Sequence, residues 1–278
     1  MDIWHMRGGN RLDGACFVQG SKNASLPIIA ASIISPARTE LMNVPQLRDV
    51  DAALRILRHL GCTAEQRQNE VYIDSTYLSC SAIPNSLMEE MRSSVIFMGA
   101  LLARCGEARL SLPGGCQLGR RPIDLHLSAL RQMGAVVDED GPEIYCRAEK
   151  LHGAVIDLPF PSVGATENIM LTACAARGRT VINGAAREPE ITALQDYLRT
   201  MGAEIGGAGS STVVIEGFSA NDPAVCRMIP DRLVASTIAC AAAAVGGNGE
   251  MRGVAPEHFS TVLYFLNQAG CDIISNNR

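Results

Sequence analysis

Aromatic residues are scarce in this sequence: they make up 4% of its 278 residues, and tryptophan occurs once. Core packing must therefore come mainly from aliphatic side chains, in a chain that is 47% hydrophobic. Basic residues are also outnumbered, 24 against 29 acidic ones, so the chain lacks the positive excess that favours binding to nucleic acids or anionic membranes. The composition predicts a globular protein with neither a nucleic-acid nor a membrane partner.

The ten cysteines lack a metal-binding pattern. No pair is spaced as Cys-x-x-Cys, and no Cys/His cluster has the spacing of a zinc site. The N-terminus has no basic segment followed by an apolar run, and the apolar stretch 239–247 is too short to span a bilayer. We therefore expect free thiols in a reducing cytoplasm, and neither a metal nor another cofactor.

The chain contains an internal repeat of roughly seventy residues. Four amphipathic segments each end at a glycine, a residue that readily adopts the left-handed conformation closing a helix. These glycines are Gly61, Gly134, Gly202 and Gly270. A second, more apolar helix recurs out of phase with the first, over residues 26–34, 94–104, 168–177 and 234–245. Three of these apolar helices are expected to end at Gly106, Gly178 and Gly249.

Strand-like stretches follow each helix. We therefore expect every repeat to contain strands, one buried helix and one amphipathic helix. Repeated α/β units of this size favour a closed arrangement with helices inside and sheets outside. The sequence shows no low-complexity linker, and it predicts a domain boundary near residues 218–232.

The second repeat carries an insertion, residues 112–122, that offers a thiol and two cations close together. Its three glycines would let the loop close over a ligand and exclude water. Arg120 and Arg121 would lower the pKa of the Cys116 thiol and favour the reactive thiolate. The alternative is an ordinary surface turn, but an exposed cysteine beside arginines is a liability without a use. We therefore favour a functional loop.

Three apolar helices begin with residues suited to an anion. Lys22 and Asn23 open the first, Arg92 lies at the corresponding place in the second repeat, and residues 162–166 (Ser-Val-Gly-Ala-Thr) open the third. Backbone N–H groups at such a helix start bind phosphate or carboxylate. Helix capping explains the serine, threonine and asparagine equally well. If the repeats surround a pseudo-threefold axis, these helix starts converge near one site.

Four motifs together resemble the UDP-N-acetylglucosamine 1-carboxyvinyltransferases of the enolpyruvyl transferase family. They are residues 20–27 (GSKNASLP), 112–126 (LPGGCQLGRRPIDLH), 162–166 (SVGAT) and 185–190 (AAREPE). The resemblance runs along the whole chain, and the cysteine-containing loop is its most specific element. It implies inverse α/β barrel-like domains built from repeated βαβαββ units, three to a domain. The first domain would cover residues 20–230, and residues 1–19 with 231–278 would form an incomplete second domain.

The resemblance also implies the reaction: the enolpyruvyl group of phosphoenolpyruvate moves to the 3′-hydroxyl of UDP-N-acetylglucosamine, and phosphate leaves. This is the first committed step of peptidoglycan precursor synthesis. Cys116 would be the proton donor and the target of fosfomycin, and Lys22 and Arg121 would bind phosphoenolpyruvate. Asn23 and Arg92 would contact the sugar nucleotide. The remaining implied substrate-binding residues, which surround its uridine and diphosphate, are Pro122, Ile123, Asp124, Leu125, His126, Ser162 and Val163.

Two departures from the family pattern qualify these expectations. Phe160 stands where some relatives have a cation near the uridine, and the fourth repeat ends at Arg278. A three-repeat second domain needs two further repeats, which in the family carry the general base. We therefore expect a truncated chain with slow or no turnover. The alternatives are an inactive paralogue that binds UDP-sugars and a 5-enolpyruvylshikimate-3-phosphate synthase, whose family members lack the cysteine loop.

Overall fold

The structure is a computed structural model that describes residues 5, 7–111, 123–139, 141, 143–218 and 223–275. The chain divides into two compact units. Lys22–Met228 forms the larger unit, and the segments before and after it form the smaller one.

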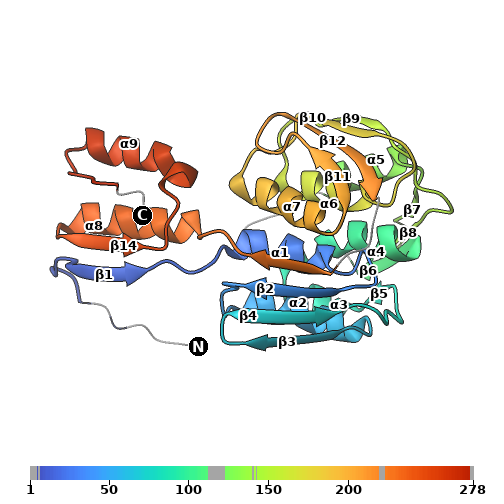
Figure 1. Cartoon of the computed structure of the whole chain (residues 1–278), viewed down its shortest axis with the longest axis horizontal. Helices are drawn as coiled ribbons and strands as arrows, with labels where there is room; N and C mark the ends of the chain where they lie inside the picture. Colours follow the sequence, from blue (N-terminus) through green and yellow to red (C-terminus); the bar gives the residue numbers. More distant parts are fainter. Residues whose placement is uncertain are drawn as a thin grey trace. The chain divides into compact units, whose positions relative to one another are not determined.

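The larger unit contains three four-stranded sheets of equivalent topology (Figure 1). Their orders are β13-β2-β4-β3, β5-β6-β8-β7 and β9-β10-β12-β11, and in each the first pair is parallel and the other two are antiparallel. The strands are β2 (Arg38–Met42), β3 (Thr63–Arg67), β4 (Glu70–Asp74), β5 (Ala82–Ile83), β6 (Glu107–Ser111), β7 (Val136–Asp138), β8 (Glu143–Arg147), β9 (Val155–Asp157), β10 (Thr180–Asn183), β11 (Ala203–Gly206), β12 (Thr212–Phe218) and β13 (Ala224–Arg227). Because β13 pairs with β2, the end of the unit completes the sheet begun at its start.

Three apolar helices form the centre of this unit: α1 (Lys22–Ala31), α4 (Phe97–Cys105) and α6 (Val163–Ala173). A 3₁₀ turn, η1 (Arg92–Ile96), leads into α4. All side chains from Ala24 to Ala31 and from Ala165 to Ala173 are buried. The α4 helix packs against both α1 and α6, and Figure 1 shows the three sheets outside these helices. The predicted arrangement, with helices inside and sheets outside, is confirmed.

The amphipathic helices are α2 (Arg48–His59), α5 (Asp124–Gln132) and α7 (Pro189–Thr200), and a short helix, α3 (Asn85–Met88), precedes η1. In α2, for example, Val50, Leu54 and Leu57 are buried on one face. The predicted stop glycines follow these helices with positive φ angles: +98° at Gly61, +93° at Gly134 and +96° at Gly202. Because side chains disfavour this conformation, the periodic glycines are explained by backbone geometry.

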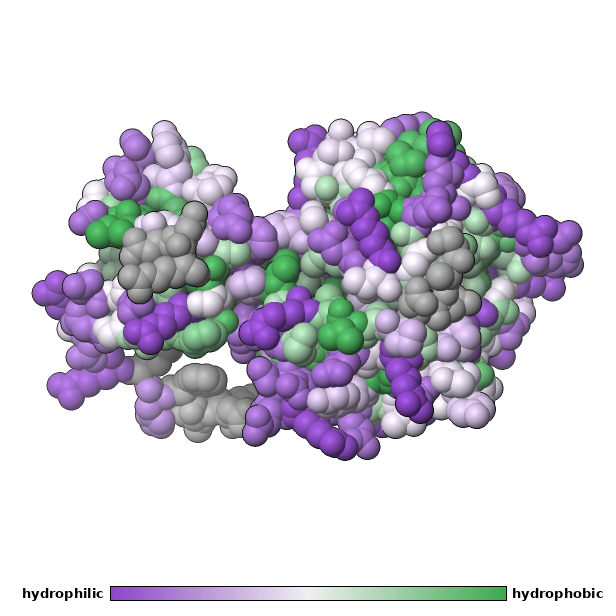
Figure 2. All heavy atoms as spheres, in the orientation of Figure 1, coloured by the Kyte–Doolittle hydropathy of each residue, from purple (hydrophilic) through white to green (hydrophobic). Residues whose placement is uncertain are grey.

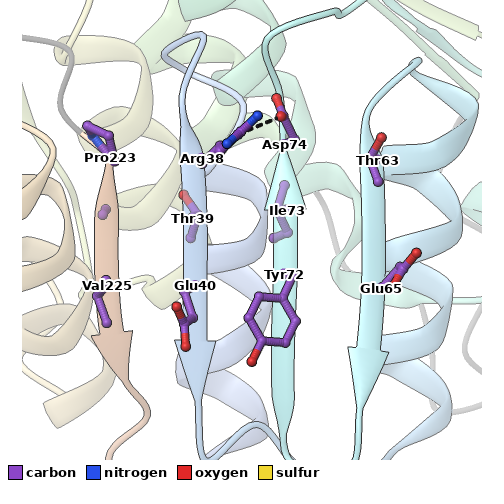
Figure 3. A pocket seen from close by; sticks show the side chains of 11 residues that line it. Arg38, Thr39, Glu40, Thr63, Glu65, Tyr72, Ile73, Asp74, Pro223 and Val225 are labelled. Carbon is purple, nitrogen blue, oxygen red and sulfur yellow. Dashed lines mark hydrogen bonds and ion pairs between the residues drawn. The ribbon is translucent and has the colours of Figure 1, made fainter.

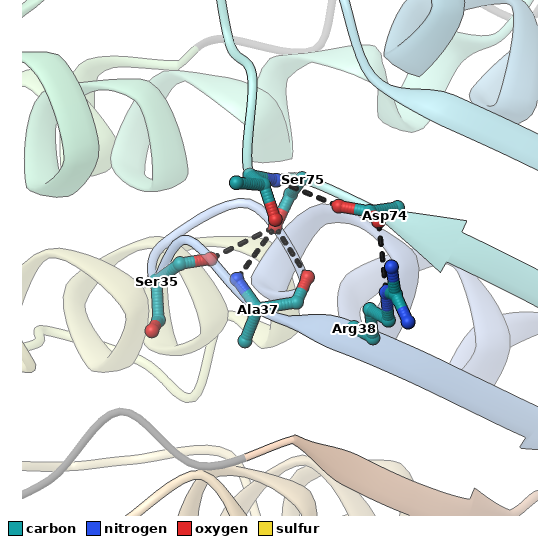
Figure 4. A network of polar contacts seen from close by, with 6 residues as sticks. Ser35, Ala37, Arg38, Asp74 and Ser75 are labelled. Atoms are coloured by element: carbon teal, nitrogen blue, oxygen red, sulfur yellow. Dashed lines mark hydrogen bonds and ion pairs between the residues drawn. The ribbon is translucent and has the colours of Figure 1, made fainter.

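The connection from α1 to β2 is fixed by the hydroxyl of Ser75 (Figure 4). Its Oγ lies 2.8 Å from the carbonyl oxygen of Ser35 and 3.0 Å from that of Ala37. A hydroxyl has one hydrogen, so it donates to one of these carbonyls at a time. Beside it, Asp74 accepts a hydrogen bond from Arg38 Nε at 3.0 Å. This bond joins the start of β2 to the end of β4.

The smaller unit has a parallel pair of strands, β1 (Gly14–Phe17) and β14 (Gly249–Arg252), with α8 (Arg232–Val245), η2 (Pro256–Phe259) and α9 (Ser260–Gln268). Its buried core consists of Val18, Ala235 and Phe259. Asp231 caps α8, because its Oδ1 accepts hydrogen bonds from the backbone N–H groups of Leu233 and Val234 at 2.9 and 3.1 Å.

Two sequence expectations about helix ends were wrong. Gly249 does not end the apolar helix of the fourth repeat: α8 stops at Val245 with Gly246 as its C-cap, and Gly249 opens β14. Gly178 does not end the third apolar helix either, because α6 ends at Ala173 with Cys174 as its C-cap. The start of α6 agrees with the expected opening at residues 162–166, since the Ser162 side chain caps the helix.

Figure 2 shows one face of the molecule, on which apolar patches lie between polar side chains. Among the residues that the structure describes, no helix is long and apolar enough to cross a bilayer. Within the same ranges, no group of three or more His, Cys, Asp or Glu side chains is arranged to hold a metal ion.

Candidate active site

Part of the predicted site lies outside the described residues. Cys116, Arg121 and Pro122 belong to the segment 112–122, and of Arg92 the structure describes the backbone, at the start of η1, but not the side chain. The other predicted residues lie at the starts of α1, α5 and α6.

Lys22 is the first residue of α1, where the helix dipole and backbone N–H groups favour an anion. Its Nζ lies 2.9 Å from Asp49 Oδ2, near the start of α2. Both side chains are partly exposed, so this ion pair is screened by solvent and contributes little to stability. Asn23 beside it is exposed. The ion pair places the Lys22 ammonium beside the starts of both α1 and α2.

The start of α5 carries four of the predicted residues. Asp124 begins the helix and is exposed, Ile123 and Leu125 are half-buried, and His126 is buried. Burial lowers the pKa of His126 to about 4, against a smaller opposing effect of the Asp124 charge. The imidazole is therefore neutral at neutral pH.

The start of α6 lies beside the start of α5. A β-carbon built on Gly164 would lie 3.1 Å from Cε1 and 3.4 Å from Nε2 of His126, so the absence of a side chain lets the imidazole approach the helix. Ser162 and Val163, the predicted ligands on this helix, are half-buried. The structure thus brings residues 123–126 and 162–164 together, although they are far apart in the sequence. η1, which contains Arg92, contacts both α1 and α6.

A further acidic group lies inside α6. The Glu167 carboxyl has a pKa raised well above its usual value, first by burial and then by the charges of Glu190 and Glu188. Two of these glutamates belong to the AAREPE motif of residues 185–190. The buried carboxyl is therefore neutral over more of the pH range than an exposed one.

Sequence reasoning missed three residues that this geometry adds: Asp49, Gly164 as a contact of His126, and Asn168. Asn168 had a detectable signal, because a buried amide within an apolar helix needs specific partners. Asp49 had none, since an acidic residue in the first turn of α2 is also the ordinary choice for a helix start. Phe160, noted for replacing a cation in some relatives, has an exposed side chain.

A shallow depression of about 430 Å³ lies elsewhere, on the outer face of the sheet β13-β2-β4-β3 (Figure 3). Glu40, Glu65, Tyr72 and Val225 line it, and the labelled strands present these side chains across the sheet. It contains none of the residues predicted from the sequence. The two charged residues at its end, Arg38 and Asp74, pair with each other.

Comparison with known proteins agrees with this arrangement of helices and sheets. Residues 6–278 match the family described as EPSP synthase (3-phosphoshikimate 1-carboxyvinyltransferase). A UDP-N-acetylglucosamine 1-carboxyvinyltransferase 2 from Caldanaerobacter subterraneus subsp. tengcongensis is 44% identical over 277 residues, and a UDP-N-acetylglucosamine 1-carboxyvinyltransferase from Trichlorobacter lovleyi is 42% identical over 278. Each comparison covers 100% of this chain and 66% of the relative, so the chain spans just under two thirds of these relatives' length.

Solved structures show the same fold. The enolpyruvyl transferase NikO from Streptomyces tendae superposes with a TM-score of 0.76 and 25% identity, over 84% of this chain and 56% of that one. EPSP synthase from Acinetobacter baumannii gives a TM-score of 0.75 and 23% identity, over 98% of this chain and 62% of that one. With the repeat, the helix starts and the family match in agreement, the chain belongs to the EPSP synthase (3-phosphoshikimate 1-carboxyvinyltransferase) family, whose members share this enolpyruvyl transferase fold.

Proposed function

We propose that this chain is part of a UDP-N-acetylglucosamine 1-carboxyvinyltransferase, an enzyme of peptidoglycan precursor synthesis. The observation that carries the proposal is the match, along the whole chain, to relatives of that name at 42–44% identity. The Cys116 loop, the most specific of the four matching motifs, supports it. Both substrates, phosphoenolpyruvate and the sugar nucleotide, are cytoplasmic metabolites, so we place the protein in the cytoplasm.

The proposed domain organisation follows the repeat. Residues 20–230 would form a first domain of three repeats, and residues 1–19 with 231–278 would contribute to a second. The separation of Lys22–Met228 as a compact unit supports this division.

The proposed reaction has two stages. The 3′-hydroxyl of the sugar loses its proton and adds to the central carbon of phosphoenolpyruvate, while Cys116 protonates the methylene carbon. The tetrahedral intermediate then loses a proton from the resulting methyl group, and the carbon–oxygen bond to phosphate breaks. The products are the enolpyruvyl ether and inorganic phosphate, so the balance needs no oxidant or reductant.

The described residues suit the binding steps of this reaction. Lys22, held beside Asp49 at the start of α1, would bind the negative charge of phosphoenolpyruvate. The adjoining starts of α5 and α6 would receive the uridine and diphosphate. Cys116 and Arg121 would complete the site from the loop, and Asn23 and Arg92 would contact the sugar nucleotide.

The proposal is tested by phosphate release from phosphoenolpyruvate, with either UDP-N-acetylglucosamine or shikimate 3-phosphate as acceptor. We expect slow release with the nucleotide, because the chain matches 66% of the length of its relatives, and none with shikimate 3-phosphate. A Cys116→Ala variant should lower the rate at least about 100-fold, the usual scale for losing a general acid. Release with shikimate 3-phosphate in place of the nucleotide would overturn the proposal. So would calorimetry on the folded chain that shows shikimate 3-phosphate binding and no binding of the nucleotide.

A further inference from the structure

Asn168 is a fully buried amide in the middle of the apolar helix α6, and it joins three other elements. Its Oδ1 accepts a hydrogen bond from the backbone N–H of Gly99 in α4 at 2.8 Å. Its Nδ2 lies 3.2 Å from the carbonyl oxygen of Val95 in η1 and 2.7 Å from Nδ1 of His126 in α5. One side chain thus links the starts of α4 and α5 to α6.

These contacts fix the orientation of the amide. The Gly99 N–H is a donor, so it requires the amide oxygen, and the Val95 carbonyl is an acceptor, so it requires the amide nitrogen. The opposite orientation would place donor against donor and acceptor against acceptor. The nitrogen of Asn168 therefore faces His126 Nδ1 as a donor.

The orientation of the amide in turn fixes the protonation of the imidazole. Because Asn168 Nδ2 only donates, His126 Nδ1 must accept and carries no hydrogen. The proton of the neutral ring then lies on Nε2. A doubly protonated ring would set two N–H groups against each other in a buried position, which agrees with the lowered pKa of His126.

Cε1 and Nε2 of the ring lie against the first turn of α6, where Gly164 has no side chain. Among the described residues, no hydrogen bond engages Nε2. An uncharged donor therefore lies beside the first turn of α6, close to the backbone N–H groups at the start of that helix. An oxygen acceptor is the chemical group that suits such a place.

We propose that Asn168 is a positioning residue that holds His126 as the neutral Nε2–H tautomer, so that Nε2 donates a hydrogen bond to an oxygen of the bound sugar nucleotide. The second part rests on the proposed function. The first part concerns the protein without ligand and stands by itself.

The tautomer is measured by ¹⁵N–¹H correlation spectra of the ring nitrogens in the full chain at pH 7. The five histidines are distinguished by loss of one spin system in a His126→Phe variant. We expect the pattern of a neutral ring with a proton on Nε2 and none on Nδ1. A proton on Nδ1, or an imidazolium, would overturn the inference.

An Asn168→Asp variant tests the cause, because it nearly preserves the shape of the side chain. One carboxylate oxygen would keep the bond to Gly99, and the other would present an acceptor to His126 in place of a donor. We expect a proton to appear on Nδ1, either as the other tautomer or as an imidazolium. Thr172→Val on the same helix is the matched control: it removes the hydroxyl bonds to Asn168 and Gly99 carbonyls and should leave the tautomer unchanged. An unchanged tautomer in Asn168→Asp would contradict the positioning role.

The ligand part is tested with UDP as the probe. We expect UDP to shift the Nε2–H resonance, and His126→Phe to weaken UDP binding about tenfold, as for loss of one hydrogen bond to a charged oxygen. If UDP binds and leaves Nε2–H unchanged, the ligand part is wrong and the proposed function survives. If neither UDP nor UDP-N-acetylglucosamine binds the folded chain, the proposed function fails, while the tautomer spectra still decide the role of Asn168.

Discussion

In the larger unit, burial gives individual polar side chains an unusual response to pH. His126 is the clearest case, since its ring is buried and its Nδ1 faces a donor. Its usual pKa of 6.5 falls to about 4 in the folded protein. The same ring is solvated in the unfolded chain and takes up a proton near its usual pKa.

The neutral ring therefore stabilises the folded state fully above about pH 6.5, and this contribution is lost as the pH falls through about 4. A change of this size corresponds to roughly 3 kcal/mol in the free energy of unfolding. We predict that this free energy, measured by urea titration between pH 7.5 and 4.5, falls less steeply with decreasing pH in His126→Phe than in the wild type. Equal slopes would show that His126 titrates normally in the folded chain.

At the scale of elements, the close packing of α4 on α6 depends on Gly99. A β-carbon there would lie 2.6 Å from the carbonyl oxygen and 2.7 Å from Oδ1 of Asn168, and 2.9 Å from Thr172 Oγ1. The first of these atoms belongs to the backbone of a buried helix and cannot move aside alone. Glycine thus allows two helices to approach and allows the Asn168 amide to reach the α4 backbone.

We predict that Gly99→Ala destabilises the protein by about 1–3 kcal/mol, the usual cost of overpacking, despite the higher helix propensity of alanine. Chemical denaturation of the two proteins provides the measurement. Gly8→Ala is the control, because nothing lies within 4 Å of its β-carbon and it should be neutral. A Gly99→Ala variant as stable as the wild type would mean that the helices are less closely packed than described.

The stability of helix α8 depends on its N-cap residue, Asp231. Asp231 accepts two backbone hydrogen bonds at the helix start, and asparagine is able to do the same with its side-chain oxygen. We predict that Asp231→Ala lowers the free energy of opening α8, measured by amide exchange, by about 1 kcal/mol. Asp231→Asn should keep most of that stability. Equal losses in both variants would assign the effect to the charge of Asp231 rather than to capping.

At the scale of the whole molecule, the two units differ in the size of their cores. The larger unit buries nearly all side chains of α1 and α6, whereas α8 has one buried residue, Ala235, and α9 has none. Local stability follows the amount of buried apolar contact. We predict that backbone amides of α8 and α9 exchange with deuterium at least about 100-fold faster than those of α6, a difference of roughly 3 kcal/mol in opening free energy. Equal protection in α6 and α8 would contradict this.

Much of this architecture was accessible from the sequence, because glycines of positive φ and apolar helices recur with one period. Gly61, Gly134, Gly202 and Gly270 were all placed correctly after helices, as their φ angles near +95° require. The prediction that Gly249 ends a helix was wrong, because three glycines, 246, 247 and 249, lie close together and any of them is able to end a helix.

Only part of the candidate site could be predicted from the sequence. The motifs identified the helix starts, but no local pattern shows that Asn168 reaches His126 or that Asp49 reaches Lys22. Such pairs are set by how helices from different repeats pack together. Side-chain partners between distant segments follow from tertiary structure and not from spacing.

If the proposed function is right, the starts of α5 and α6 bind a sugar nucleotide. The most direct test is to add UDP-N-acetylglucosamine to the ¹⁵N-labelled chain and map the backbone amides whose resonances shift. We expect shifts concentrated in residues 123–126 and 162–166, with smaller ones near Lys22 at the start of α1. Shifts concentrated instead around the outer sheet, at residues 38–40 and 72–74, would contradict it.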